Sequence, residues 1–389
     1  MLPRITAAPP PHQIPALESS AEQDVVKSAI PDASIAGVAV KVGVVGLGGV
    51  AHRIHLPACR SVPEIEVVGG CDPSADAREA VSKLGVPRTF ETIAELLEKT
   101  APDVIIVGTP PSSHFAICDA AFRAGAHVFC EKPFMPDVEQ ADRIIEIARE
   151  RNLLLRVNNQ YRFMSFYRDT KDRLDRGEFG RCFYLQAWQQ MFHPPARESN
   201  WRSQLTQYVL YEFGTHALDL ASFFFNALPV SVNAHIPRAR PEFDADVLVH
   251  ASLRFPEERL AVFSFNRISH APEKYLEMRL DCEHASLRIS LGGVARVSVE
   301  WSRAARKPIF KAGFLKGGQA RAEIDGRTTT YSTSRRGEFA SATAEHLRFF
   351  LSEMRKPVRS LEGATHAREI LNLVFAGYES ASSGETVHL

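Results

Sequence analysis

The chain has 389 residues, of which 45% are hydrophobic and 24% charged, a composition typical of a globular protein with about two domains. Its 46 Lys and Arg residues balance 46 Asp and Glu residues, so no overall field attracts nucleic acid or an anionic membrane. No stretch approaches the roughly 20 apolar residues of a membrane span, and the first residues lack the apolar run of a secretory signal. We therefore expect a cytoplasmic protein with no nucleic-acid or membrane partner.

The six cysteines form no C-x-x-C pair, and several lie in apolar or strand-like surroundings. We expect them to be reduced and buried, rather than to form disulfides or hold zinc. His52 and His55 resemble a metal pair, but no carboxylate or cysteine at a matching spacing accompanies them. We expect no metal site.

Residues 1–37 are rich in proline and alanine and show no sustained period. They are predicted to form a flexible tail, because they bury too little surface to offset the entropy of ordering. The alternative is an arm that reaches a neighbouring subunit.

Residues 38–157 alternate short apolar strands with helical segments. The strands are VAVKVGVVG, IEVVGGCD, DVIIVGTP, AHVFC and LLLRVNN, and Pro57 breaks or restarts the helix that follows the first of them. Alternating strands and helices favour a parallel sheet with helices on both faces. We predict an N-terminal α/β domain of the doubly wound Rossmann type.

Residues 158–389 have a different pattern, with alternating or β-rich runs such as FYLQAWQQMF, DVLVHASLRF, RLAVFSFNRI, YLEMRLDCEHASLRIS and RVSVEWS. Helices are predicted near residues 207–226, 338–355 and 361–381, and ETVHL resembles a short strand. Residues 302–336 carry many Lys and Arg residues and are predicted to be a solvated loop, with a phosphate-bearing partner as the alternative. We predict a C-terminal α+β domain with a large, open, mainly antiparallel sheet.

The first strand ends in the motif G-x-G-x-x-A, from Gly46 to Ala51, which also opens a predicted helix. Gly46 permits a tight turn, Gly48 lets the backbone approach a pyrophosphate, and Ala51 allows close packing of helix on strand. The helix start adds free N–H groups and a partial positive charge. We expect Gly46, Gly48, Gly49, Val50 and Ala51 to bind a dinucleotide.

Asp72 closes the second strand, 26 residues after Gly46. A carboxylate there accepts hydrogen bonds from the adenosine ribose and repels a 2′-phosphate, so NAD is favoured. Ser74 and Arg78 together can accept a phosphate, which leaves NADP possible. The alternative for Asp72 is an ordinary helix cap.

The segment Gly108–His114, GTPPSSH, follows the strand DVIIV. Loops after the carboxyl ends of parallel strands line the ligand crevice, so Thr109, Pro110 and His114 are expected to contact the cofactor. The alternative is a proline-rich turn with a capping serine.

Glu131-Lys132-Pro133 follows another apolar strand. With VGVVGLGGVA, TPPSSH, GAHVFCEKP, NNQYRF, GTHALDLA and the terminal YESASSGETVHL, this tripeptide resembles the pattern of the Gfo/Idh/MocA oxidoreductase family from about residue 38 to 389. The resemblance implies a Rossmann domain followed by an α/β domain with an open sheet, often used for oligomerisation. We expect a homo-oligomer, either a dimer or a tetramer.

The resemblance implies that Lys132 is catalytic, that Glu131 borders the cofactor and that the bond before Pro133 is cis. Lys132 beside a nicotinamide can stabilise the alkoxide-like charge of hydride transfer, and it also contacts substrate. The family pattern D-x-x-x-H implies His216 as general base or acid. Glu212 stands where Asp is usual, four residues before His216 and on the same helix face.

Each of these residues has a structural alternative. His216 can be a buried structural histidine, and Glu212 can be a carboxylate paired with an arginine. Asp219 is expected to be structural, or to support another site residue without contacting the substrate. Arg162, Trp201 and Arg202 match positions that border cofactor or substrate, Arg162 on the substrate side and the other two on the cofactor side. Their alternatives are an interdomain ion pair and an ordinary core tryptophan.

The predicted activity is hydride transfer between NAD, with NADP as the alternative, and a secondary alcohol or ketone of a sugar, polyol or related cyclic substrate. His216 accepts the hydroxyl proton, helped by Lys132, and Glu212 and Arg162 contact the substrate. Two alternatives remain: a glycosidase-type enzyme that recycles bound NAD, and a non-catalytic NAD-binding regulator with the same fold.

Overall fold

The computed structural model describes residues 39–198, 201–292, 294–302, 307–315, 317–334 and 338–389. The chain divides into two units, residues 1–37 and residues 38–389, and the predicted tail lies outside the described residues.

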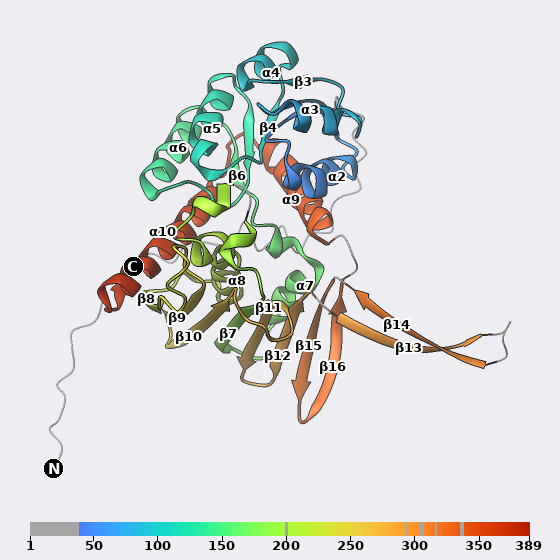
Figure 1. Ribbon diagram of the computed structural model, residues 1–389, viewed down its shortest axis with the longest axis vertical. Helices are drawn as coiled ribbons and strands as arrows, with labels where there is room; N and C mark the ends of the chain where they lie inside the picture. Colours follow the sequence, from blue (N-terminus) through green and yellow to red (C-terminus); the bar gives the residue numbers. More distant parts are fainter. Residues whose placement is uncertain (1–38, 199–200, 293, 303–306, 316, 335–337) are drawn as a thin grey trace. The chain divides into compact units, whose positions relative to one another are not determined.

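A six-stranded parallel sheet occupies the first part of the second unit, in the order β3-β2-β1-β4-β5-β6 (Figure 1). Its strands are β1 Val40–Val45, β2 Ile65–Cys71, β3 Thr89–Phe90, β4 Val104–Val107, β5 His127–Cys130 and β6 Leu155–Val157. The chain leaves β3 at one edge and returns beside β1, so the strand order reverses between β1 and β4. A crevice for ligands is typical of this switch point. The predicted doubly wound sheet is confirmed.

Helices cover both faces of the first sheet. They are the π-helical turn η1 Ala51–His55, α2 Leu56–Arg60, α3 Ala75–Ser82, α4 Ile93–Thr100, α5 His114–Arg123 and α6 Val138–Glu150. Pro57 is the second residue of α2, which continues the π-helical turn without a gap, so the helical run over residues 49–60 is not broken at this proline as was expected. Thr92 and Glu95 form a capping box on α4, and Asp137 caps α6 by accepting the N–H of Gln140.

Helix α9, Glu338–Met354, comes late in the chain but packs on the first sheet, beside α2 and η1 (Figure 1). Its Ala344, Leu347, Phe350 and Leu351 share a core with buried residues of β1 and β4. The predicted helix over 338–355 therefore exists, and its place is on the first sheet.

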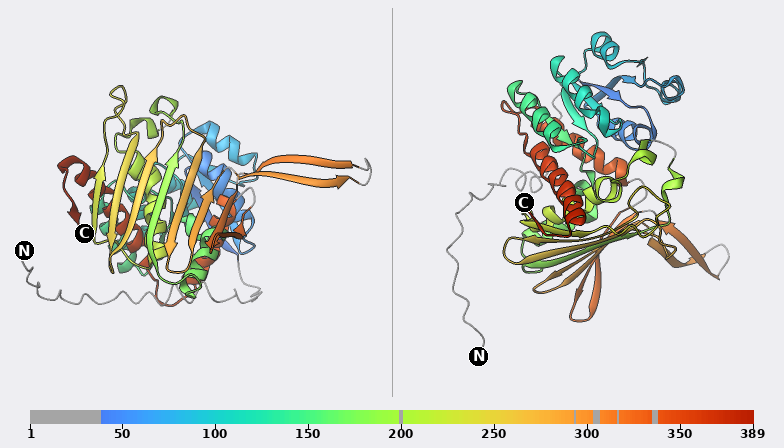
Figure 2. Two further views of the ribbon diagram at one scale, coloured as in Figure 1. Left: turned by 90° about the horizontal axis from the view of Figure 1, so that it is seen from below. Right: turned by 60° about the vertical axis from the view of Figure 1, so that its left-hand side comes forward.

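A nine-stranded sheet forms the second part, in the order β16-β15-β12-β11-β7-β10-β9-β8-β17. Its strands are β7 Cys182–Gln190, β8 Ser231–His235, β9 Leu248–Phe255, β10 Arg259–Asn266, β11 Lys274–Cys282, β12 Ser286–Leu291, β15 Gly318–Ile324, β16 Arg327–Thr333 and β17 Val387–His388. The pairs are antiparallel except that β7 and β10 run parallel. Helices α7 Ser165–Asp175, α8 Thr215–Phe225 and α10 Glu362–Ser383 lie on one face, and Figure 2 shows the opposite face without described helices. The predicted open, mainly antiparallel sheet is confirmed.

The prediction of a loop over residues 302–336 was wrong. This stretch contains β14 Lys307–Leu315, β15 and β16, and β14 pairs with β13 Val294–Ser302 in a separate two-stranded ribbon (Figure 1). In β15, Gly318, Ala320 and Ala322 are buried, while Gln319 and Arg321 between them remain half-exposed. Alanines alternating with long polar residues form a half-buried strand whose charged residues hide its period.

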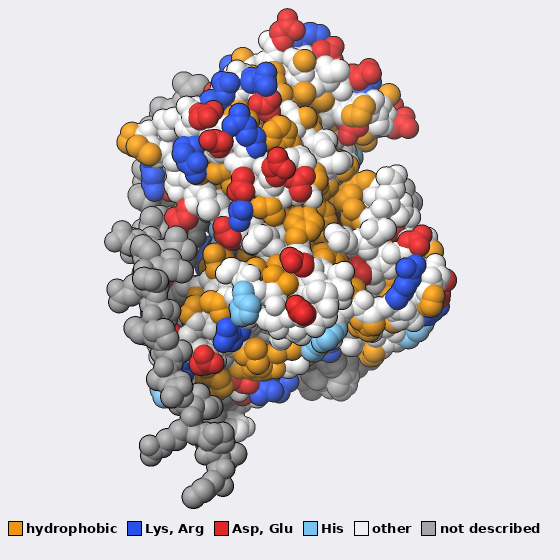
Figure 3. Space-filling model, turned by 90° about the vertical axis from the view of Figure 1, so that its left-hand side faces the viewer, with side chains coloured by type: hydrophobic (Ala, Val, Ile, Leu, Met, Phe, Trp, Pro, Cys, Tyr) orange, Lys and Arg blue, Asp and Glu red, His pale blue; other side chains and the backbone are white. Residues whose placement is uncertain are grey.

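The six cysteines are buried and unpaired, as predicted. Among the described residues, no helix combines the length and apolar character that crossing a bilayer needs. On the face drawn in Figure 3, side chains of both charge signs are interspersed, in line with the equal totals of acidic and basic residues.

Candidate active site

A cleft of about 690 Å³ opens at the carboxyl ends of the strands in the first sheet and continues to the start of α8. At one end it is lined by the glycine turn and Asp72, and at the other by Lys132, Glu212 and His216. Further residues of the wall are Val45, Ile54, Cys71, Pro73, Ile93, Gly108, Thr109, Pro110, Ser113, Ile117, Glu131, Gln160, Tyr161, Trp201, Arg202, Tyr275 and Phe339. One continuous space therefore joins the predicted cofactor and catalytic residues.

The glycine turn has the shape that a dinucleotide requires. Gly46 has a φ of +88°, and a Cβ atom there would lie 2.7–2.8 Å from the Gly108 backbone and the Thr109 side chain. Gly48 has no neighbouring atom within 4 Å of such a Cβ, so its α-carbon faces open cleft. A pyrophosphate can approach the backbone at Gly48, whereas any side chain at this position would project into the space it needs. Gly49 and Val50 also line the cleft, and Ala51 is buried behind them.

Asp72 stands directly beside this turn. Its carboxylate accepts the Leu47 N–H at 2.9 Å and the Ser74 N–H at 2.8 Å, and it lines the cleft. The Arg78 guanidinium donates to the carbonyl oxygens of Asp72 and Pro73 at 2.7 and 2.8 Å, and the Ser74 hydroxyl caps α3. The two groups that were candidates to hold a 2′-phosphate are therefore engaged in holding the Asp72 turn.

Thr109 and Pro110 lie in the cleft wall, but His114 does not. His114 is fully buried, with Nε2 2.8 Å from the Thr109 carbonyl oxygen and Nδ1 2.9 Å from that of Phe134. Burial lowers the pKa of His114 and keeps its ring neutral. The structure thus places His114 between two loops of the site, not at the cofactor contact that we expected.

Glu131 anchors the loop that carries Lys132. Its carboxylate accepts the Asn158 side-chain N–H at 2.7 Å and the Lys132 backbone N–H at 3.2 Å, and His55 Nε2 lies 3.1 Å away. Burial alone raises the pKa of Glu131, but the contacts with His55 and Asn158 outweigh it and lower the pKa to about 2. The Lys132–Pro133 bond is cis, as the resemblance implied.

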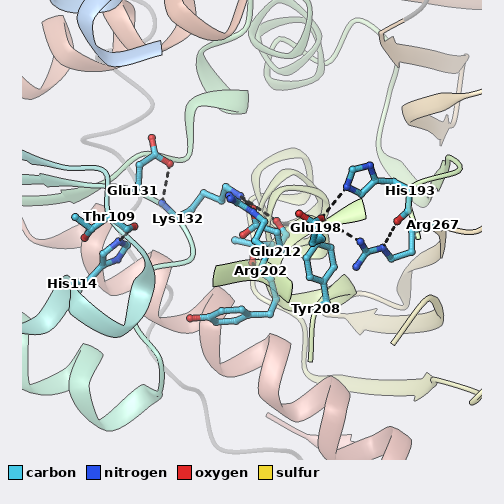
Figure 4. A network of polar contacts seen from close by, with 12 residues as sticks. Thr109, His114, Glu131, Lys132, His193, Glu198, Arg202, Tyr208, Glu212 and Arg267 are labelled. Carbon is cyan, nitrogen blue, oxygen red and sulfur yellow. Dashed lines mark hydrogen bonds and ion pairs between the residues drawn. The ribbon is translucent and has the colours of Figure 1, made fainter. Parts of the chain in front are cut away.

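Lys132 reaches from the first sheet to the segment before α8. Its Nζ lies 3.2 Å from Glu212 Oε1 and donates to the Glu212 carbonyl oxygen at the same distance (Figure 4). Arg202 contacts the same carboxylate oxygen through Nε at 2.8 Å and Nη2 at 2.7 Å. Glu212 Oε2 is buried, has no hydrogen-bond partner and belongs to a side chain in the cleft wall. Glu212 therefore lines the cleft and is also paired with an arginine, and its role in the reaction stays a prediction.

His216 enters the same cleft from α8. Glu212 belongs to the π-helical segment η6, Val209–Gly214, which leads directly into this helix. Burial, followed by the positive charge of Lys132, lowers the pKa of His216 to about 3. The imidazole is therefore neutral near pH 7, and its unprotonated nitrogen can accept a hydrogen bond.

Two sequence comparisons bear on this site. Residues 40–159 match the family described as oxidoreductase family, NAD-binding Rossmann fold, and residues 167–288 match the C-terminal domain of the same family, Gfo/Idh/MocA. The chain belongs to the Gfo/Idh/MocA family. Its first domain is therefore a dinucleotide-binding domain of the NAD-binding Rossmann class, as predicted.

Relatives within the family have diverse names. The chain is 27% identical over 206 residues to an uncharacterized oxidoreductase, C26H5.09c, of Schizosaccharomyces pombe, which covers 52% of this chain. It is 30% identical over 210 residues to dTDP-3,4-didehydro-2,6-dideoxy-alpha-D-glucose 3-reductase of Actinomadura kijaniata, and 28% over 197 residues to scyllo-inositol 2-dehydrogenase (NAD+) of Bacillus subtilis, covering 54% and 50% of this chain. The matched segments span 55–62% of these relatives' own lengths.

A solved oxidoreductase of Agrobacterium radiobacter, in complex with NAD+, L-tartaric acid and magnesium, has the same fold. Its TM-score is 0.74 at 16% identity, with 90% of this chain and 98% of that chain covered. At this identity the likeness concerns the fold alone.

In this Gfo/Idh/MocA chain, another expected site residue besides His114 lies outside the described cleft wall. Arg162 is absent from the described cleft wall, and its Nε is bonded to Asp219 Oδ2 at 2.9 Å. Asp219 is buried, and its Oδ1 accepts a hydrogen bond from Asn159 Nδ2 at 3.1 Å. His366 Nε2 lies 3.0 Å from the same oxygen. Arg162 therefore forms an ion pair, but within the second predicted domain and not between the two domains, and Asp219 is its buried partner.

Trp201 and Arg202 come from the short helix η5, Trp201–Gln204, and both line the cleft. The Arg202 guanidinium stacks 4.5 Å above the Trp201 ring, so Trp201 is not an ordinary core tryptophan. Glu198, three residues before Trp201, helps to hold this loop in place. Its carboxylate accepts the Tyr208 hydroxyl at 2.7 Å and lies 3.2 Å from the buried Arg267 (Figure 4).

The cleft-wall residues that were not predicted include Gln160, Tyr161, Tyr275 and Phe339. Gln160 and Tyr161 follow β6 directly, so the rule of loops at strand ends was sufficient to find them. Tyr275 lies in β11 and Phe339 at the start of α9, and no local pattern connects either residue to the glycine turn.

Proposed function

We propose that this protein is an NAD(P)-dependent oxidoreductase that transfers a hydride between the nicotinamide and a secondary alcohol or ketone of a sugar, polyol or related cyclic compound. The observation that supports this most is the single cleft that runs from the glycine turn to Lys132, Glu212 and His216. When bound, the nicotinamide supplies the hydride acceptor or donor. The residues of this chain hold the substrate and move its proton.

His216 acts in this proposal as the proton acceptor, because it is buried, neutral and in the cleft wall. Lys132 presents an ammonium group where negative charge develops on the substrate oxygen, and Glu212 holds that ammonium at 3.2 Å. His216 thus accepts the hydroxyl proton, and the Lys132 ammonium stabilises the oxygen that loses it.

A hydroxyl-rich substrate is supported by acceptor atoms that have no partner in the described structure. Glu212 Oε2, Gln160 Oε1 and His216 Nδ1 are buried, lack hydrogen bonds, and belong to side chains that line the cleft. Buried acceptors without a donor cost free energy, so a ligand that brings several O–H groups is favoured. The named activities of the two relatives from Actinomadura and Bacillus, on a deoxysugar and an inositol, agree with this chemistry.

NAD is the expected cofactor, and Asp72 is expected to select it. We predict that Asp72→Ser lowers the preference for NAD+ over NADP+, measured as the ratio of dissociation constants, by about tenfold or more. The carboxylate that repels the 2′-phosphate is lost, along with an acceptor for the ribose. Asp76→Ser removes a nearby exposed carboxylate from α3 and serves as the matched control. An unchanged ratio in Asp72→Ser would remove Asp72 from cofactor selection.

The function is tested by incubating the purified protein with NAD+ or NADP+ and a panel of sugars, glycosides and inositols, and following the absorbance of the reduced cofactor. The proposal expects net reduction with at least one polyhydroxylated substrate. Sugar release from a glycoside without net reduction would instead assign the glycosidase-type activity. Cofactor binding without any turnover in the panel would favour the regulator. A cytoplasmic location and a homo-oligomeric state remain predictions.

A further inference from the structure

His216 has an unusual environment for a proton-transferring histidine. In such sites, a carboxylate or carbonyl usually accepts a hydrogen bond from one ring nitrogen and so fixes the ring's orientation. Here Nδ1 is buried and has no hydrogen-bond partner among the described residues. Asp219, one turn further along α8, is occupied by Arg162, His366 and Asn159.

An aromatic ring occupies the place next to the imidazole instead. The Tyr161 ring lies parallel to the His216 ring, with centroids 3.8 Å apart and an interplanar angle of 3°. Tyr161 is 3% exposed and is itself held on several sides: its hydroxyl donates to the Tyr275 hydroxyl at 3.3 Å, and its ring contacts Tyr167 and Phe339. A parallel stack at this distance restricts rotation of the imidazole about its bond to Cβ.

We propose that Tyr161 is a positioning residue, whose ring holds the His216 imidazole in the orientation that presents a nitrogen to the cleft. The stack takes the place of the hydrogen-bonded carboxylate and also keeps water from that face of the ring. The inference rests on the proposed function for its kinetic consequence, because His216 must transfer the proton for its orientation to affect turnover. The orientation and protonation of the ring do not depend on turnover.

The charged groups that act on His216 come from the loop after β5 and from α8. Lys132 disfavours its protonated form, whereas Asp219 and Glu131 favour it, and burial outweighs all three. Tyr161 adds no charge at neutral pH, because burial raises its pKa well above the usual range. A change at Tyr161 therefore acts through packing and water access, not through a lost charge.

Three variants separate stacking from general packing. Tyr161→Leu removes the stacked ring, Tyr161→Phe keeps the ring and loses its hydroxyl, and Tyr167→Leu removes a neighbouring buried ring that does not touch His216. Tyr161→Leu is expected to lower kcat by about 10–100-fold, with KM for the cofactor unchanged within about twofold. Tyr161→Phe should retain at least about a third of kcat. Tyr167→Leu should lower the stability of the protein without changing the pH range in which the His216 signals titrate.

The same variants are examined by NMR of ¹⁵N-labelled imidazoles, with His216→Gln to assign the resonance. In the parent protein and in Tyr161→Phe, the His216 signals should not titrate between pH 8 and 5. In Tyr161→Leu they should titrate above pH 5, because water reaches the ring. Absence of this titration, or an equal loss of kcat in Tyr161→Phe and Tyr161→Leu, would overturn the proposed role. A normal NMR result in a protein that reduces no cofactor would contradict the proposed function and leave the stacking role intact.

Discussion

Lys132→Met is expected to lower kcat by at least about 10³-fold while leaving the affinity for the cofactor within about threefold of the parent value. Methionine preserves the length and packing of the side chain but provides no charge and no proton. Nothing else in the described cleft wall places an ammonium next to Glu212 and His216, and Arg202 is engaged with Glu212 from the other side. Turnover is measured by absorbance of the reduced cofactor, and binding by calorimetry.

Lys83→Met is the matched control, since Lys83 is an exposed lysine in an ion pair with Glu79. This variant should keep full activity. Should Lys132→Met also keep it, Lys132 would have no part in the chemistry. A loss of cofactor affinity equal to the loss of kcat would show that Lys132 binds the cofactor and does not act in the transfer.

Gly48→Val is expected to weaken cofactor binding by at least about 100-fold, while the free energy of unfolding changes by less than about 1 kcal/mol. A Cβ atom at this position has no protein atom within 4 Å, so the valine side chain projects into the space in front of the turn. Calorimetric titration measures the affinity, and urea unfolding measures the stability. Parent-like affinity would show that the pyrophosphate lies elsewhere.

A side chain at Gly46, unlike one at Gly48, is expected to lower the stability of the protein. Gly46→Ala should lower the free energy of unfolding by about 2–4 kcal/mol, because the new Cβ meets the Gly108 backbone at 2.7 Å and the left-handed conformation is strained as well. Gly85→Ala is its control, with the same φ of +88° and no atom within 4 Å, so it carries the strain without the clash. Equal losses in the two variants would contradict a role for the close approach of Gly46 to Gly108.

Much of the fold was predictable because burial on both faces leaves a clear local signature. The strand runs before Gly46, Asp72 and Lys132 are apolar after their first one or two residues, as is typical of strands covered by helices on both sides. The two-residue strand β3 is too short to show any period, and α7 and β8 were not predicted. Residues 302–336 were misassigned because frequent Lys and Arg residues concealed the alternation of strands.

The residues of the candidate site were predictable where a motif directly follows a strand. They were not predictable where only the tertiary structure brings two side chains together. Lys132, Glu212 and His216 meet as expected, because the strand end and the helix each carry a recognisable pattern. Arg162 was assigned to substrate, although its partner Asp219 lies 57 residues away and only the folded chain brings the two together. The stacking of Tyr161 on His216 is equally invisible in the sequence, because the two rings belong to separate elements.

The account depends most on the glycine turn and the lysine sharing one dinucleotide site. Isothermal titration of the purified protein with NAD+ and with NADP+, at ligand concentrations from micromolar to millimolar, tests this most directly. Saturable binding with a preference for NAD+ is the predicted result, together with its loss in Gly48→Val. Absence of heat from either dinucleotide, in a protein that also contains no tightly bound cofactor by mass spectrometry, would contradict the account.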